Sequence, residues 1–107
     1  MLPIINHIAQ EYKAALKNLY GHQFAELILF GSHARGDFHP ESDIDFAVIL
    51  TGPFVTATSE IFKTAPISTT LNLKYGVSIS TLPVSLAKIK TSMQGVYQEI
   101  RKEGILI

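Results

Sequence analysis

The stretch from residue 26 to residue 50 places the tightest limits on how this chain can fold. It begins with a short apolar run, residues 26–30, which is too brief for an ordinary helix and is typical of a buried strand. Gly31 and Ser32 follow at once, and a second, mostly apolar run covers residues 43–50. Because glycine interrupts regular structure, the pattern predicts two strands joined by a tight turn and a loop. Ser32 is expected to cap a short helical turn that runs through Arg35.

Helical patterns lie on both sides of these strands. Apolar residues recur at helical spacing across residues 3–20, which predicts an amphipathic helix that ends before Gly21. Residues 54–75 also favour a helix, but Pro66 has no amide hydrogen and is expected to divide it into two pieces. A last amphipathic helix is predicted over residues 92–103.

A third strand is predicted over residues 77–82, where apolar side chains alternate with Ser78 and Ser80 as on a half-buried strand. Pro83 is expected to end it. The last residues, 105–107, are apolar, and they either add an edge strand or dock on a partner. The order of elements predicts an α+β fold, a small mixed sheet flanked by helices.

Length and composition limit both the architecture and the function. A chain of 107 residues fits one compact domain over its whole length. Hydrophobic residues make up 47% and charged residues 17%, which is enough apolar material for a core and too little charge for a disordered chain. Nine Lys and Arg balance nine Asp and Glu, so nucleic acid is an improbable direct ligand and a protein partner is favoured.

The chain has no cysteine, which excludes disulfides, thiolate zinc sites and cysteine nucleophiles. This composition fits a reducing compartment, and we expect a cytoplasmic protein. The first residues lack a basic stretch followed by a long apolar run, so neither a signal peptide nor a membrane span is expected.

The residues best suited to chemistry lie within positions 31–45. Gly31 allows backbone amides to approach a ligand that a Cβ atom would obstruct, and Ser32 adds a hydroxyl group and the start of a helical turn. Free amides at such a turn suit a phosphate oxygen. Asp43 and Asp45 stand two apart, so on a strand their carboxylates share one face. Two carboxylates beside a triphosphate favour Mg²⁺, which prefers carboxylate and phosphate oxygens.

Gly-Ser, ten intervening residues and Asp-x-Asp, here Gly31-Ser32 and Asp43-Ile44-Asp45, resemble the signature of the DNA polymerase beta nucleotidyltransferase superfamily. The Ala34-Arg35-Gly36 and Ser42-Asp43 segments look like its small prokaryotic members, the minimal nucleotidyltransferases.

This resemblance implies a polymerase beta-like nucleotidyltransferase fold over residues 1–107. It also implies that Gly31 and Ser32 bind the phosphates of ATP or another nucleoside triphosphate, and that Asp43 and Asp45 are catalytic residues that hold Mg²⁺. Members of this kind often act as antitoxins beside a helical HEPN-domain toxin, and some adenylylate it. The resemblance therefore implies adenylyl transfer to a protein partner within a hetero-oligomer.

The chain departs from the family pattern at one place. Active members carry a third carboxylate on a neighbouring strand, whereas the corresponding polar positions here are Ser78 and Ser80, and no acid lies between Glu60 and Glu99. Serine cannot replace a carboxylate as an anionic ligand or as a general base. An alternative is therefore an antitoxin with weak or no catalysis that neutralises its partner by contact. A third hypothesis is a nucleotide sensor.

Several residues near the motif keep two interpretations. Arg35 is a secondary candidate for nucleotide binding, and pairing with Asp37 or Glu41 is an equal alternative. His33 and His39 lie in the same loop, where exposed histidines are usually solvated, and we favour that interpretation over catalysis. A basic set near the C-terminus is interpreted as the solvated face of a helix. Its members are Lys88, Lys90, Arg101 and Lys102.

Overall fold

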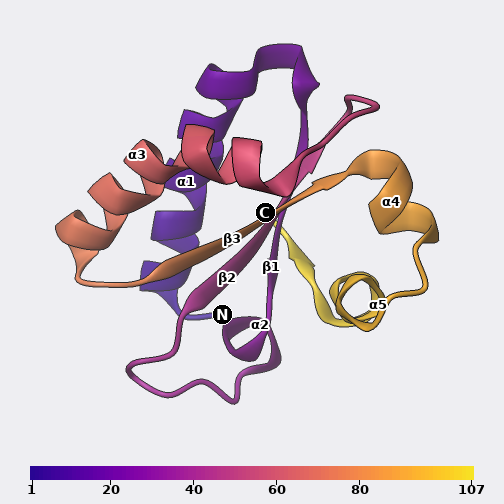
Figure 1. Ribbon diagram of the computed structural model, residues 1–107. Helices are drawn as coiled ribbons and strands as arrows, with labels where there is room; N and C mark the ends of the chain where they lie inside the picture. Colours follow the sequence, from indigo (N-terminus) through magenta and orange to yellow (C-terminus); the bar gives the residue numbers. More distant parts are fainter.

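The computed structural model describes residues 1–107 and forms a mixed α+β fold (Figure 1). Its elements in chain order are α1 (Pro3–Tyr20), a 3₁₀ turn (Gly21–Gln23), β1 (Phe24–Phe30), α2 (Ser32–Arg35), β2 (Ile44–Leu50), α3 (Ala57–Tyr75), β3 (Ile79–Ser85), α4 (Leu86–Thr91), α5 (Gly95–Glu103) and β4 (Ile105–Leu106). No helix among them combines the length and the apolar content needed to cross a bilayer.

The four strands form one mixed sheet in the order β3-β2-β1-β4. Strand β1 is antiparallel to both β2 and β4, whereas β2 and β3 run parallel. Helix α3 makes the crossover that two parallel strands require. Helices α1 and α3 cover one face of the sheet and α4 and α5 the other, while α2 lies beside the ends of β1 and β2 (Figure 1). The predicted small mixed sheet flanked by helices is confirmed.

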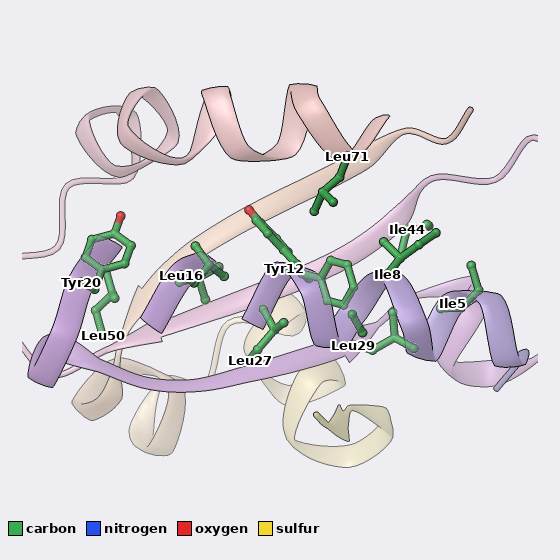
Figure 2. Close-up of a cluster of buried hydrophobic side chains, with 13 residues drawn as sticks. Ile5, Ile8, Tyr12, Leu16, Tyr20, Leu27, Leu29, Ile44, Leu50 and Leu71 are labelled. Atoms are coloured by element: carbon green, nitrogen blue, oxygen red, sulfur yellow. The ribbon is translucent and has the colours of Figure 1, made fainter. Parts of the chain in front are cut away.

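The main core lies between the sheet and the α1/α3 layer. Figure 2 shows side chains from α1, β1, β2 and α3 meeting there. Tyr12 is fully buried, its ring lies 5.4 Å from that of Phe46, and its hydroxyl is 2.7 Å from Oγ1 of Thr81. The hydroxyl of Tyr20 donates to the buried carboxylate of Glu60 at 3.0 Å. The polar groups in this core are therefore paired, as burial requires.

A second, smaller core fills the space between the opposite face and the α4/α5 layer. The sheet contributes Ala47 and Ile49 from β2 and Val84 from β3. Tyr97 and Ile100 of α5 pack against these side chains. Since side chains alternate between the faces of a strand, Asp45 lies on the same face as Ala47 and Ile49. This alternation places Asp45 in the layer that α5 covers.

Both prolines that were expected to break an element lie inside one. Pro66 stands within the continuous helix α3, so the predicted division into two pieces is wrong. Its ring is exposed, while Thr64 and Leu71 of the same helix are buried, and this packing offsets the lost hydrogen bond. Pro83 lies within β3 rather than at its end. Because β3 is an edge strand, a residue without an amide hydrogen is tolerated there.

Other boundaries agree or shift slightly. The predicted first helix and the short turn after the first strand are confirmed as α1 and α2, but the N-cap of α2 is Gly31 and not Ser32 as predicted. Helix α4 was not predicted; it begins after Ser85, whose hydroxyl accepts a hydrogen bond from the amide of Lys88 at 3.2 Å. Helix α5 starts at Gly95 instead of residue 92. The C-terminal residues form an edge strand, which confirms one of the two alternatives left open.

Candidate active site

The turn between β1 and α2 is built around Gly31, which has a φ of 73° that few other residues adopt. The amides of Ala34 and Arg35 both donate to the Gly31 carbonyl at 3.1 Å, which closes the helical turn. The amides of Ser32 and His33 precede these donors and therefore have no acceptor within the turn. This arrangement leaves backbone donors at the predicted phosphate-binding position.

Gly31 also lies directly against Asp45. Phe30, the residue before Gly31, is the antiparallel partner of Asp45 in the sheet. A Cβ atom added to Gly31 would collide with the carboxylate of Asp45. The fold therefore brings together two parts of the predicted motif that lie 14 positions apart in the sequence.

Replacing Gly31 by alanine is expected to lower the free energy of unfolding by about 2 to 3 kcal/mol, because the new methyl group meets both a strained φ and the Asp45 carboxylate. Urea denaturation measures the change. Gly36→Ala is the matched control: Gly36 has a φ of 89° but no atom within 4 Å of an added Cβ, so about 1 kcal/mol is expected. Equal losses in the two variants would contradict a tight approach of Asp45 to Gly31.

The two aspartates differ in their surroundings. Asp43 is exposed and lies just before β2, which begins at Ile44 and not at residue 43 as predicted. Asp45 is half-buried within β2. Burial raises the pKa of Asp45, the negative charge of Asp43 raises it further, and His33 lowers it. A cation beside Asp45 would offset the negative charge that Asp43 places near this half-buried carboxylate.

The donor set fits Mg²⁺. Carboxylate oxygens are its preferred protein ligands. No group of three or more His, Asp or Glu side chains is arranged to hold a metal ion. Of the predicted motif, Asp43 and Asp45 are the two carboxylates that would hold Mg²⁺. Mg²⁺ commonly takes its remaining ligands from water and substrate phosphates, which the adjacent Gly31 turn would hold in place.

Ser80 occupies the place beside Asp45 on the neighbouring strand. The parallel register pairs Asp45 with Ser80, and register partners in a parallel pair point to the same face. Ser80 is exposed, and Ser78 lies two residues earlier, where its carbonyl accepts the amide of Ile44 at 2.9 Å. The sequence could not distinguish these serines, whereas the register identifies Ser80 as the residue level with Asp45.

Arg35 makes ion pairs with carboxylates of two elements. Its Nε lies 3.2 Å from Asp37, as one alternative predicted, and no ion pair joins it to Glu41. Its Nη1 lies 2.7 Å from Glu99 and 3.6 Å from Glu103, both on α5. The sequence offered only a weak signal for this contact, the i,i+4 spacing of two glutamates on one helix face.

The two loop histidines differ. His39 is exposed, as predicted, but His33 is buried, so the prediction of a solvated His33 is wrong. The His33 ring stacks on Phe38 with 4.6 Å between centroids, and its Nε2 lies 3.4 Å from the Ser42 carbonyl. These contacts connect the loop between Arg35 and Asp43 to α2.

The basic set near the C-terminus is exposed, as predicted. Two of its members also stabilise the α4/α5 layer. Arg101 donates to the carbonyl of Ile89 at 2.8 Å, and Lys88 lies 5.2 Å from the centre of the Tyr97 ring. These contacts account for two of the four charges without a nucleic-acid ligand.

The chain is similar to one known protein family and to two proteins of a single organism. The model of the nucleotidyltransferase domain family matches residues 9–107. MJ0141 of Methanocaldococcus jannaschii, a proposed protein adenylyltransferase, is 36% identical over 103 residues, which cover 94% of this chain and 96% of MJ0141. MJ0604 of the same organism, also a proposed protein adenylyltransferase, is 37% identical over 73 residues, which are 68% of this chain. The match spans 66% of MJ0604, just under two thirds of its length.

Solved structures share the fold at lower sequence identity. A proposed minimal nucleotidyltransferase superposes with a TM-score of 0.59 at 20% identity. The superposition covers 96% of this chain and 95% of the chain of that nucleotidyltransferase. A chain of a toxin–antitoxin complex crystallised with AMP-PNP gives a TM-score of 0.61 at 17% identity. That superposition covers 89% of this chain and 68% of the chain from the complex. The family match over residues 9–107 and the 36% identity to MJ0141 show that the chain belongs to the nucleotidyltransferase domain family.

Proposed function

We propose that this protein is an Mg²⁺-dependent nucleotidyltransferase that moves the adenylyl group of ATP to a partner protein. The observation that carries the proposal is the direct contact between the Gly31 turn and the Asp45 carboxylate. This contact joins a phosphate-binding backbone to a metal-binding side chain within one site. The match of the nucleotidyltransferase family across residues 9–107 supports the same chemistry.

Each motif residue has a defined task in this scheme. The backbone at Gly31 and Ser32 holds the triphosphate, and Asp43 and Asp45 hold the metal beside it. Bound Mg²⁺ supplies charge neutralisation for the phosphoryl oxygens during transfer. A bond forms between an acceptor hydroxyl oxygen and the α-phosphorus, and the bond from that phosphorus to the oxygen bridging to the β-phosphate breaks. Pyrophosphate leaves, and the proton of the acceptor hydroxyl passes to water. The chain therefore contributes mainly position and charge.

We propose a HEPN-type toxin as the partner and antitoxin as the role. The sequence resemblance to minimal nucleotidyltransferases implies it, and the fold shared with a chain of a toxin–antitoxin complex is consistent with it. The names of the relatives from M. jannaschii, proposed protein adenylyltransferases, support transfer of an adenylyl group to a protein acceptor. The balance of nine basic and nine acidic residues also favours a protein partner over nucleic acid. The absence of cysteine suits the cytoplasm.

The direct test combines the protein, labelled ATP, Mg²⁺ and the product of the adjacent gene. Label is expected on that product, seen after denaturing electrophoresis and by an added adenylyl mass. Asp45→Ala is expected to abolish labelling because it removes half of the carboxylate pair. Labelling that persists in Asp45→Ala would rule out the proposed mechanism.

One observation favours a second candidate, neutralisation by contact. Strand β3 presents Ser80 where the family's third carboxylate is expected, level with Asp45. A protein that neutralises its partner without transfer retains this effect when both Asp43 and Asp45 are replaced by alanine. Co-expression of the toxin with the double variant measures it: survival of the cells supports contact, and loss of protection supports transfer.

A further inference from the structure

Arg35 is surrounded by more negative charge than one cation neutralises. Asp37 lies 3.2 Å from its Nε, while Glu99 and Glu103 lie 2.7 and 3.6 Å from its Nη1. The Arg35 side chain remains 37% exposed, so an incoming ligand can reach it. Two donor positions of its guanidinium are thus engaged by carboxylates before any nucleotide arrives.

The carboxylates on α5 reach Arg35 from a helix that is firmly held. Tyr97 and Ile100 of α5 are buried in the second core. Gly104, directly after the helix, fits so closely that an added Cβ would collide with the Ile100 carbonyl and the Ile28 side chain. A change at this contact therefore involves the Glu99 and Glu103 side chains, whereas the helix keeps its place.

The contact adjoins the proposed triphosphate site. Arg35 ends the helical turn that Ser32 begins, so its guanidinium emerges three residues after the phosphate-binding backbone. Helix α5 also covers the face of the sheet on which Asp45 lies, so the charge of Glu99 is on the same side of the sheet as Asp45. A carboxylate and a phosphate accept hydrogen bonds from the same paired N–H donors of arginine. Only one of them can therefore occupy a given edge of the guanidinium group.

We propose that Glu99, assisted by Glu103, competes with the triphosphate of the nucleotide for Arg35 and thereby sets nucleotide affinity. This inference rests on the proposed function. Glu99 acts through Arg35 and is a positioning residue, not a catalytic one. When a triphosphate binds, its oxygens replace the Glu99 carboxylate at Nη1, and the two glutamates turn toward solvent. Loss of the negative charge at position 99 frees Arg35 and removes repulsion of the phosphates, so both effects strengthen binding.

Isothermal titration of the intact protein with Mg²⁺-ATP and with Mg²⁺-tripolyphosphate tests the competition. Glu99→Gln is expected to bind each ligand about threefold to tenfold more tightly than the wild type, the range of one or two exposed ion pairs. Equal gains for both ligands are expected because Arg35 meets the phosphates and not the base. Glu103→Gln, whose longer contact is weaker, is expected to give a smaller gain. Glu41→Gln is the matched control, since Glu41 lies in the loop but has no ion pair with Arg35, and no gain is expected.

Titration with Mg²⁺ alone separates competition from a general change in the site. Glu99→Gln removes negative charge near Asp45, so its affinity for Mg²⁺ without nucleotide is expected to fall or stay equal. Unchanged or weaker Mg²⁺-ATP binding by Glu99→Gln, or the same gain in Glu41→Gln, would overturn the competition. If the wild type binds ATP and Glu99→Gln binds it no more tightly, only this inference is refuted. Wild-type and variant proteins that bind neither ligand refute the proposed function as well.

Discussion

Asp45→Asn is expected to lower the rate of adenylyl transfer by about a thousandfold or more, which corresponds to the several kcal/mol that a metal-held phosphate contributes to transfer. The amide keeps the size of the side chain, so the close contact with Gly31 remains, but the anionic ligand is lost. The rate of labelling of the partner protein measures the loss. Glu26→Gln, on β1, is the control for a neutralised acid away from the motif. A residual rate within tenfold of the wild type would contradict a metal-binding role for Asp45.

In the absence of metal, Asp45→Asn is expected to be more stable than the wild type. The pKa of Asp45 is raised in the folded state, so its protonated form favours folding and this contribution is lost as the pH rises through the folded pKa. At neutral pH the ionised side chain therefore costs stability, which Asp45→Asn removes. A melting temperature about 2 to 4 °C higher is expected at pH 7, and the gap should close as the pH falls below the ordinary aspartate range. A lower melting temperature for Asp45→Asn at pH 7 would contradict a pKa of Asp45 that is raised by burial and by the charge of Asp43.

Ser80→Asp is expected to raise affinity for Mg²⁺ about tenfold and the transfer rate about a hundredfold, the range of an added general base. The register places position 80 level with Asp45 on the same face, so the new carboxylate joins Asp43 and Asp45 in one site. Without metal, a third negative charge adds repulsion, and the melting temperature is expected to fall. Calorimetry with Mg²⁺ and the partner-labelling rate check these expectations.

Ser80→Asn is the matched control, because it introduces a side chain of the same size without charge. Ser80→Asp and Ser80→Asn should therefore differ in metal affinity and transfer rate, while both retain the fold of an exposed strand position. If the two variants bind Mg²⁺ equally, position 80 is not adjacent to the ion. A gain confined to Ser80→Asp would also indicate that the lack of an anionic ligand at position 80 limits turnover.

The sequence alone determined much of the local structure. Helical spacing predicted α1 to its last residue, and the change from an apolar run to Gly31 predicted the end of β1. These features depend on neighbours close in the chain, which periodicity and glycine report directly. The Gly-Ser and Asp-x-Asp residues also predicted the family, because phosphate and metal binding require those residue types at nearly fixed spacing.

The prolines show where local rules failed. Pro66 and Pro83 break hydrogen-bonding patterns wherever they occur, so the sequence favoured an interruption at each. Whether that loss ends an element depends on the surrounding packing. In α3 the buried face continues past Pro66, and in β3 the edge position removes the need for the missing amide hydrogen.

The site, like the fold, was predicted only in part from the sequence. The sequence predicted which residues carry the chemistry: Gly31, Ser32, Asp43 and Asp45. Only the tertiary structure decided that Asp45 touches Gly31, that Ser80 rather than Ser78 stands beside it, and that Arg35 is held by Glu99. Spacing along the chain reports the faces of a single element, whereas strand register and the packing of α5 on the sheet join residues 14 to 64 positions apart. Those long-range contacts depend on the core as a whole, and no local pattern encodes them.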